Sequence, residues 1–111
     1  MKKLVLVILI ITIFTTSGFA YFMTCNKYLE LSDEQRICYI MGVDDCMTLT
    51  ASINNKDYCQ KWKAATEGMT AGQLRKIVDK YLDEHPEILH MEAAYGVIAA
   101  IQEIMAKREG Q

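Results

Sequence analysis

The sequence predicts an all-α fold, namely a small disulfide-stapled domain of about four to five helices that follows a cleaved signal peptide. Three observations support this fold class. Apolar residues recur at the helical period through the second half of the chain, and two Ser/Thr-x-x-Gln patterns have the form of helix-starting capping boxes. Four cysteines, Cys25, Cys38, Cys46 and Cys59, lie between residues 25 and 59. We expect these cysteines to staple a core that is small for an exported domain.

The N-terminus has the pattern of a secretory signal peptide. Lys2 and Lys3 precede an apolar run, and the segment then becomes small and polar up to Ala20. Gly18 and Ala20 suit the positions three and one before a cleavage site, so we predict cleavage after Ala20. No cysteine follows directly, which argues against a lipoprotein anchor. A retained membrane anchor is the alternative, but the apolar run is shorter than the ~20 residues that span a bilayer.

The predicted mature chain, residues 21–111, forms a single domain in the periplasm. Removal of residues 1–20 takes two of the 12 basic residues and none of the 14 acidic ones, which leaves a net charge of −4. No run of Lys and Arg provides a basic patch. We therefore expect neither a nucleic-acid partner nor, after cleavage, a membrane partner.

One long helix is expected from residue 33 to about residue 51. Ser32 and Gln35 form the capping box, and the nearly apolar run "ICYIMGV" indicates a buried helix. Cys38 and Cys46 then lie on one helix about 12 Å apart, beyond the ~7 Å limit of a disulfide.

Two disulfide connectivities remain open. We favour Cys25–Cys38 with Cys46–Cys59, because the midpoints of these pairs fall in the turn-like sequences "LS" and "SINN". The alternative is Cys25–Cys46 with Cys38–Cys59. A zinc site is disfavoured because close C-x(2–4)-C pairs are missing, and a redox enzyme because no C-x-x-C occurs.

A second helix is expected from Thr70, whose capping box is completed by Gln73, to about residues 83–85. His85 precedes Pro86, and a residue before proline is driven out of the helical conformation. The apolar face consists of Leu74, Ile77, Val78, Tyr81 and Leu82. The opposite, solvated face consists of Arg75, Lys76, Asp79, Lys80 and Asp83.

A last helix is expected to follow, with Pro86 in its first position and an apolar pattern that runs from Leu89 to about Lys107. The small residues Gly96, Ala99 and Ala100 would let another helix approach closely, either from the same chain or from a second copy.

The segment "HPEILH" holds the only two histidines, His85 and His90. A metal or acid–base site with Glu84 or Glu87 is one hypothesis, but the spacing is poor for ligands on a helix and no H-E-x-x-H pattern occurs. We interpret the segment as a helix corner, with His85 as a cap and His90 partly packed in the core.

Other catalytic patterns do not appear in the sequence. We expect no enzyme and no cofactor. Asp44 and Asp45 are interpreted as the solvated edge of the long helix, and Trp62 as a lid on the core.

A longer pattern resembles the Rap/Tai family of immunity proteins of bacterial type VI secretion. Family members carry a G-V-T-x-x-Q-L opening, a V-V-x-x-Y-L helix and an H-P-E-x-x-H-x-x-A corner, and an upstream Y-I-x-G-V-x-D segment resembles "YIMGVDD". The residues we assign to the motif are Gly42, Thr70, Gln73, Tyr81, His85, Pro86 and His90. The cysteine positions depart from the family pattern, so its disulfide pairing is not transferred.

The resemblance implies a small helical periplasmic protein, with a homodimer as one possibility, that binds a peptidoglycan amidase effector and blocks its active site. Asp83, Glu84 and Glu87, at the expected corner, are our candidates for the contact surface, since acidic groups suit a basic enzyme cleft. Two alternatives remain. The segment "TCNKYLEL" is also similar to HdeA-type periplasmic acid-stress chaperones, and the fold could serve an envelope accessory role without a hydrolase partner.

Overall fold

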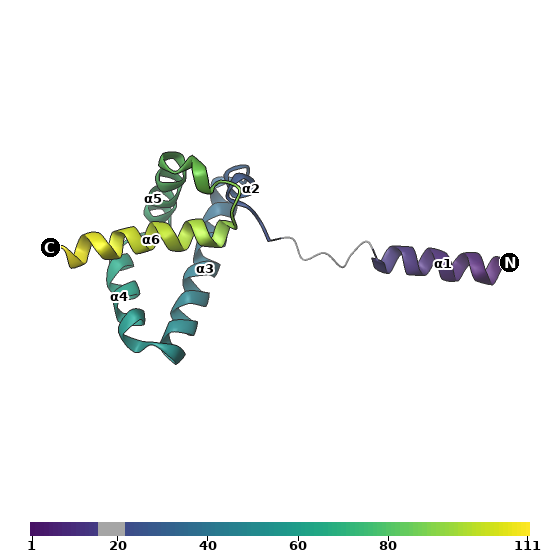
Figure 1. Ribbon diagram of the computed structural model, residues 1–111, viewed down its shortest axis with the longest axis horizontal. Coiled ribbons are helices and arrows are strands. Elements are labelled where there is room, and N and C mark those ends of the chain that lie inside the picture. The colour runs from purple at the N-terminus through teal and green to yellow at the C-terminus, as the bar shows by residue number, and fades with distance from the viewer. Residues whose placement is uncertain (16–21) are drawn as a thin grey trace.

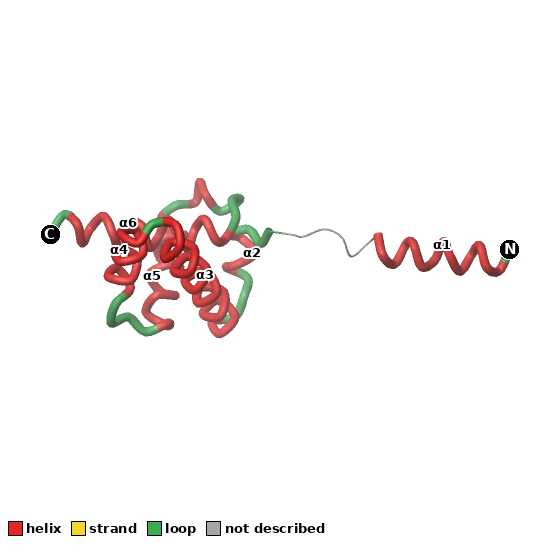
Figure 2. The backbone as a smooth tube through the Cα atoms, turned by 90° about the horizontal axis from the view of Figure 1, so that it is seen from below, coloured by secondary structure: helices red, strands yellow, loops and turns green. Residues whose placement is uncertain are grey.

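The structure, a computed structural model, describes residues 1–15 and 22–111 and consists of helices joined by short loops (Figures 1 and 2). Within these ranges the only β pairing is an isolated bridge between Thr24 and Glu92. The all-α prediction is confirmed. The elements are α1 (Lys2–Thr15), α2 (Cys25–Leu29), α3 (Asp33–Asn54), α4 (Lys56–Thr66), α5 (Ala71–Glu84), the 3-10 helix η1 (Pro86–Ile88) and α6 (Ala93–Glu109).

Both predicted capping boxes are present. The Ser32 hydroxyl accepts from the Gln35 backbone N–H at 3.3 Å, and the Gln35 side chain accepts from the Ser32 N–H at 3.0 Å. Thr70 and Gln73 make the same pair of bonds at 3.1 and 2.8 Å. These bonds satisfy backbone donors that have no partner inside the helix, which fixes where α3 and α5 begin.

Helix α6 is the centre of the domain. It contacts α2, α3, α4 and α5, and it runs across the other helices in Figure 1. Val97 and Ile101 of α6 are fully buried. The largest fully buried side chains that the other helices contribute are Tyr28, Ile40, Trp62 and Leu82.

Trp62 is a core residue rather than a lid. Its side chain is fully buried, and its indole N–H donates to Asp44 Oδ1 at 2.7 Å. Asp44 is therefore not the solvated residue that we expected, although its neighbour Asp45 is exposed. A buried indole N–H needs an acceptor, and Asp44 is one helix away on α3.

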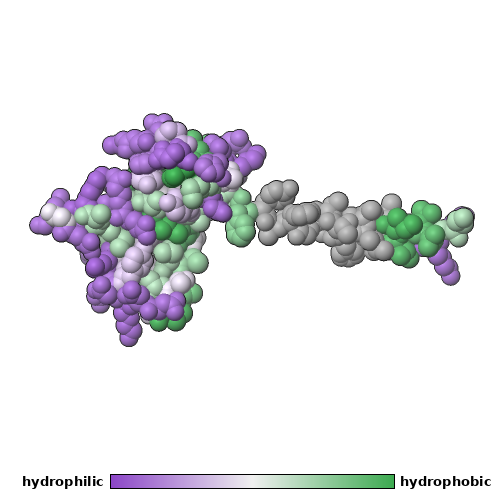
Figure 3. Space-filling model, in the orientation of Figure 1, coloured by the Kyte–Doolittle hydropathy of each residue, from purple (hydrophilic) through white to green (hydrophobic). Residues whose placement is uncertain are grey.

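The expectation that α3 is buried is wrong for most of its length. Only Ile40 and Ala51 are buried, whereas Met41, Leu49 and Ile53 are 40, 63 and 74 % exposed. Helices α4, α5 and α6 pack against α3 but leave these apolar side chains uncovered. Hydrophobic surface is consequently visible on the α3 side of the domain in Figure 3.

The structure does not contain the predicted disulfides: all four cysteines are free thiols. Cys25 and Cys59 are buried, whereas Cys38 and Cys46 are exposed, so each favoured pair would join a buried sulfur to an exposed one. Cys25 Sγ is turned toward α6 and donates to the Glu92 carbonyl at 3.5 Å. Burial raises the pKa of the Cys25 thiol, which favours its protonated form.

The small residue Gly96 of α6 allows other helices of the same chain to approach closely. A Cβ at Gly96 would lie 2.8 Å from Leu82 Cδ2 and 2.9 Å from Cys25 Sγ, so α5 and α2 approach α6 as closely as a glycine permits. Leu82 and Cys25 are themselves buried and have little room to move. The predicted close helix approach is thus confirmed between helices of one chain.

We predict that Gly96→Ala lowers the free energy of unfolding, because an overpacking cost of about 1–3 kcal/mol exceeds the gain in helix propensity of about 0.5–1 kcal/mol. Gly42→Ala is the matched control: nothing lies within 4 Å of a Cβ at Gly42 in the middle of α3, so only the propensity gain applies. Urea unfolding followed by the fluorescence of the single tryptophan measures both. The packing argument fails if Gly96→Ala is as stable as Gly42→Ala.

Candidate functional site

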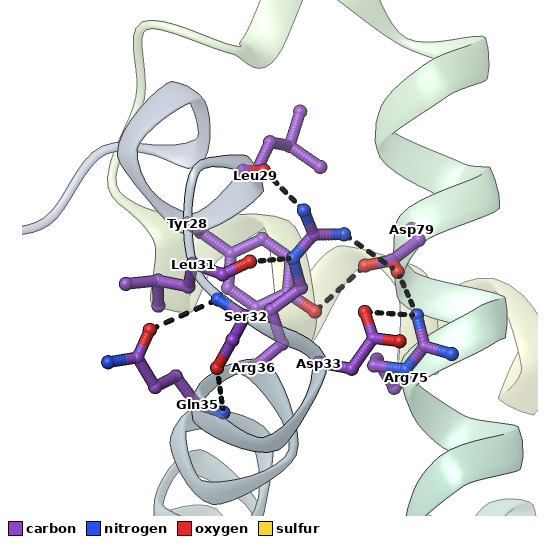
Figure 4. A network of polar contacts seen from close by, with 9 residues as sticks. All are labelled: Tyr28, Leu29, Leu31, Ser32, Asp33, Gln35, Arg36, Arg75 and Asp79. Carbon is purple, nitrogen blue, oxygen red and sulfur yellow. Dashed lines mark hydrogen bonds and ion pairs between the residues drawn. The ribbon is translucent and has the colours of Figure 1, made fainter.

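A partly buried polar network centres on Asp79 of α5 (Figure 4). The Tyr28 hydroxyl donates to Asp79 Oδ1 at 2.9 Å. Arg36 Nη1 and Arg75 Nη1 donate to Asp79 Oδ2 at 3.1 and 2.8 Å. One carboxylate thus connects α2, α3 and α5.

Arg36 also holds the turn between α2 and α3. Its guanidinium donates to the carbonyls of Leu29 and Leu31 and lies 5.6 Å from the centroid of the Tyr28 ring. A guanidinium has five donors in a rigid fork, which suits one side chain to several acceptors at once. Arg36 therefore fixes where α2 sits relative to α3.

The prediction that Arg75 and Asp79 lie on a solvated face is wrong. Their side chains are 16 and 19 % exposed, because Tyr28 of α2 and Arg36 and Asp33 of α3 contact them. Asp33 adds a further carboxylate, 3.4 Å from Arg75 Nη1. The sequence did contain one signal of this network, the oppositely charged pair Arg75 and Asp79 at a spacing of four residues.

The network is suited to holding helices rather than to acid–base chemistry. Both Asp79 oxygens accept hydrogen bonds. Burial, and then the hydrogen bond and negative charge of Asp79, raise the pKa of the Tyr28 hydroxyl far above its ordinary value of 10.0. A phenol held protonated acts as a fixed hydrogen-bond donor at neutral pH.

At the corner between α5 and α6, His85 caps the end of α5, as predicted. His85 Nδ1 donates to the Tyr81 carbonyl at 2.7 Å, and its ring stacks on the Tyr81 ring with centroids 4.0 Å apart. His90 is exposed, so its predicted packing in the core is wrong. Pro86 begins η1 instead of the last helix, which starts only at Ala93.

No cluster of three or more His, Cys, Asp or Glu side chains suited to a metal ion occurs among the described residues. The residues expected from the sequence to contact a partner lie on the surface of the domain. Asp83, Glu84 and Glu87 are all exposed at the end of α5 and in η1. Glu84 Oε1 lies 3.7 Å from Lys80 Nζ.

An open groove of about 260 Å³ lies beside these acidic residues, between α5 and α6. Its apolar lining comes from Ile77, Tyr81, Ala100 and Ile104. Its charged lining comes from two ion pairs, Lys80–Glu84 and Glu103–Lys107, of which the second measures 2.6 Å. The Lys107 ammonium holds the pKa of the Glu103 carboxyl below its usual range. Sequence reasoning missed the groove, although both ion pairs have the four-residue spacing of neighbours on a helix.

A family model described as Rap1a immunity proteins matches residues 18–104. The chain belongs to the Rap1a immunity protein family. Neither a curated protein nor a solved structure matches the chain at a significant level.

The match to the Rap1a family covers α2 to α5, η1 and most of α6. Several motif residues in it have visible structural roles, since Thr70 and Gln73 cap α5 while Tyr81 and His85 close its end. Membership in the Rap1a family indicates an immunity protein, whose partner is a protein effector. The site to be sought is therefore a protein-binding surface.

We predict that Tyr28→Phe reduces the loss of stability at alkaline pH. Because the pKa of Tyr28 is raised in the folded state, its contribution is fully present below pH 10.0, the ordinary tyrosine value, and decreases as the unfolded chain ionises above it. Above pH 10.0, the free energy of unfolding of the wild type should fall by about 1.4 kcal/mol more per pH unit than that of Tyr28→Phe. Below it, Tyr28→Phe should be less stable by about 1–3 kcal/mol, the contribution of a hydrogen bond to a charged acceptor.

Urea unfolding at intervals between pH 8 and pH 11 measures both effects. Tyr95→Phe, which removes a hydroxyl from an exposed side chain, is the control and is expected to follow the wild-type curve. Parallel curves for the wild type and Tyr28→Phe would contradict the role assigned to the Tyr28–Asp79 bond.

Proposed function

We propose that this protein is a periplasmic inhibitor that binds a peptidoglycan amidase effector of type VI secretion and blocks its active site. The observation that carries the proposal is the match to the Rap1a immunity proteins over residues 18–104. The predicted signal peptide supports it, because an inhibitor of a cell-wall hydrolase has to work where the cell wall is. The proposed mechanism is binding alone, without chemistry on the part of the inhibitor.

The acidic corner is the surface that we propose for the contact. Asp83, Glu84 and Glu87 are exposed, and the stacked Tyr81 and His85 side chains hold the end of α5, which carries the first two of them. A surface that is already ordered loses less conformational entropy on binding. Acidic groups also accelerate encounter with a basic enzyme cleft.

The periplasmic location is likewise a proposal. Helix α1 spans the apolar run of the predicted signal peptide, whereas the predicted cleavage site after Ala20 lies outside the described residues. Within the described residues, none of the helices combines the length and apolar character needed to cross a membrane.

We predict that the protein recovered from the periplasm of a Gram-negative host begins at Tyr21. Intact-mass measurement of the periplasmic and membrane fractions checks this. Replacing Ala20 with a bulky residue, as in Ala20→Tyr, should block cleavage, because the position before the scissile bond requires a small side chain. A full-length chain in the membrane fraction would support the anchor instead.

A second copy of the chain is a further proposed partner. The exposed apolar residues of α3, which include Leu49 and Ile53, support it, whereas Gly96 and Ala100 of α6 are buried within one chain. Sedimentation of the purified protein distinguishes a monomer from a dimer.

The experiment that tests the inhibitor is capture of a partner from the envelope extract of the producing bacterium at neutral pH, followed by an assay of peptidoglycan hydrolysis. We expect one dominant amidase, bound stoichiometrically and inhibited. Many clients retained only after acidification would indicate a chaperone, and a partner without hydrolase activity would indicate an accessory role.

The acidic corner is tested in the same assay. We expect the triple variant Asp83→Asn, Glu84→Gln, Glu87→Gln to bind the amidase at least tenfold more weakly, an effect of about 1.4 kcal/mol. Glu67→Gln, which neutralises an exposed glutamate just after α4, is the matched control. Unchanged affinity of the triple variant would move the contact to another surface.

A further inference from the structure

We propose that Cys38 and Cys46 of α3 form a site at which two copies of the chain become covalently linked, each Cys38 bonding to Cys46 of the other copy. This inference rests on the second copy proposed above as a partner, and it adds the surface and the chemistry that join the two copies. It does not depend on the identity of the effector.

The two exposed thiols lie on one helix and cannot bond to each other. They are eight residues apart, so their Cα atoms are separated by about 12 Å along α3, whereas a disulfide needs less than about 7 Å. The other two cysteines are buried and bonded within the domain. Cys25 Sγ donates to the Glu92 carbonyl at 3.5 Å, and Cys59 Sγ donates to the Thr48 carbonyl at 3.7 Å. The exposed pair on α3 is therefore the pair that another chain can reach.

Gly42 lies midway between the two exposed cysteines, both along α3 and around it. Each cysteine is four residues away, which is about 6 Å along the helix axis and about 40° around it, on opposite sides. Nothing lies within 4 Å of a Cβ at Gly42, so this point of α3 faces open space. A second helix can therefore approach the backbone of α3 here as closely as a glycine permits.

An antiparallel pair of α3 helices that crosses at Gly42 brings each Cys38 beside Cys46 of the other copy. In a contact with twofold symmetry, if one residue contacts a second on the other copy, the second contacts the first in return. Because both cysteines are four positions from Gly42, this crossing forms two identical bonds. Crossing at Cys38 or at Cys46 would form one bond and leave two thiols unpaired.

The rest of this face of α3 suits a second helix. Met41 and Leu49 are 40 and 63 % exposed, and a second copy would cover apolar surface that the domain leaves in water. Asp45 is the only exposed charged residue between the two cysteines, and it lies about 60° around the helix from Gly42, at the edge of the contact. The two Asp45 residues of a dimer are about 9 Å apart along the helices, beyond the screening length of about 8 Å at physiological salt.

The bonds form by thiol–disulfide exchange with an oxidised dithiol protein, a class of oxidant that suits an exported chain. The Cys38 thiolate attacks the disulfide of the oxidant and releases one of its sulfurs as a thiol. The Cys46 thiolate of the other copy then attacks the Cys38 sulfur of the mixed disulfide and releases the second sulfur. Each bond transfers two electrons to the oxidant, and the two protons that leave the cysteines end on its two sulfurs.

Non-reducing electrophoresis and peptide mapping test the inference. The full-length gene is expressed, and the protein is purified in reduced form, exposed to glutathione disulfide and separated without reductant. We expect a band at twice the mass of one chain that dithiothreitol removes. Mass spectrometry of this band should find the peptide of Cys38 joined to the peptide of Cys46.

Two single variants distinguish this contact from random collision of exposed thiols. Cys38→Ser and Cys46→Ser each leave one thiol, and neither variant should form the dimer band alone, because the remaining thiol faces a serine of the other copy. An equal mixture of the two variants should recover the band in about half of the chains, the share of mixed dimers that random pairing gives.

A substitution at the crossing point tests the close approach of the two helices. Gly42→Gln should slow formation of the dimer band at least tenfold, because its side chain stands between the helices. Ala106→Gln, which adds the same side chain at an exposed position of α6, is the matched control and should change the rate less than about twofold. Urea unfolding checks that both variants are folded.

The outcomes separate the thiol site from the proposals on which it rests. A bond from Cys38 or Cys46 to a buried cysteine of the same chain would overturn the inference, and so would single variants that each cross-link as fast as the wild type. If the reduced protein sediments as a dimer but never forms the bonds, the second copy stands and the thiol site fails. Failure to capture an amidase would refute the inhibitor without changing the assignment of the two thiols.

Discussion

The arrangement of α2, α3 and α5 depends on the hydrogen bonds and ion pairs that the Asp79 carboxylate makes. Arg36 and Arg75 are mostly removed from water, and a guanidinium in such a position is unfavourable unless an anion neutralises it. Asp79 does this for both arginines while it also accepts from Tyr28. The short helix α2 has five residues and could not hold its position alone, so this network and the contacts of α2 with α6 determine where it lies.

The same framework supports the surface proposed to bind the effector. One side of α5 carries Asp79 and is fixed to α2 and α3, while Tyr81 and Glu84 line the groove toward α6. A rigid α5 therefore connects the polar network to the acidic corner. An inhibitor benefits from this arrangement, because ordering a flexible segment on binding would reduce its affinity.

The features that the sequence predicted correctly depend on near neighbours. The capping boxes of Ser32 and Thr70 and the helix end before Pro86 are decided within four residues, and all three occur as expected. The exposed face of α3 and the separated cysteines depend on how helices pack, which an apolar run alone does not specify. Asp79 shows the limit most clearly, since its partners Arg36 and Tyr28 are 43 and 51 residues away in sequence.

The central position of α6 has a consequence for biosynthesis. Residues 93–109 are synthesised after α2, α3, α4 and α5, yet all four helices pack against them. A domain whose core needs a helix that is synthesised after the others cannot fold as a unit until that helix has emerged from the ribosome. If the chain is exported as we propose, this order keeps the precursor open until residues 93–109 have been made, which is the state that passage through a narrow translocation channel requires.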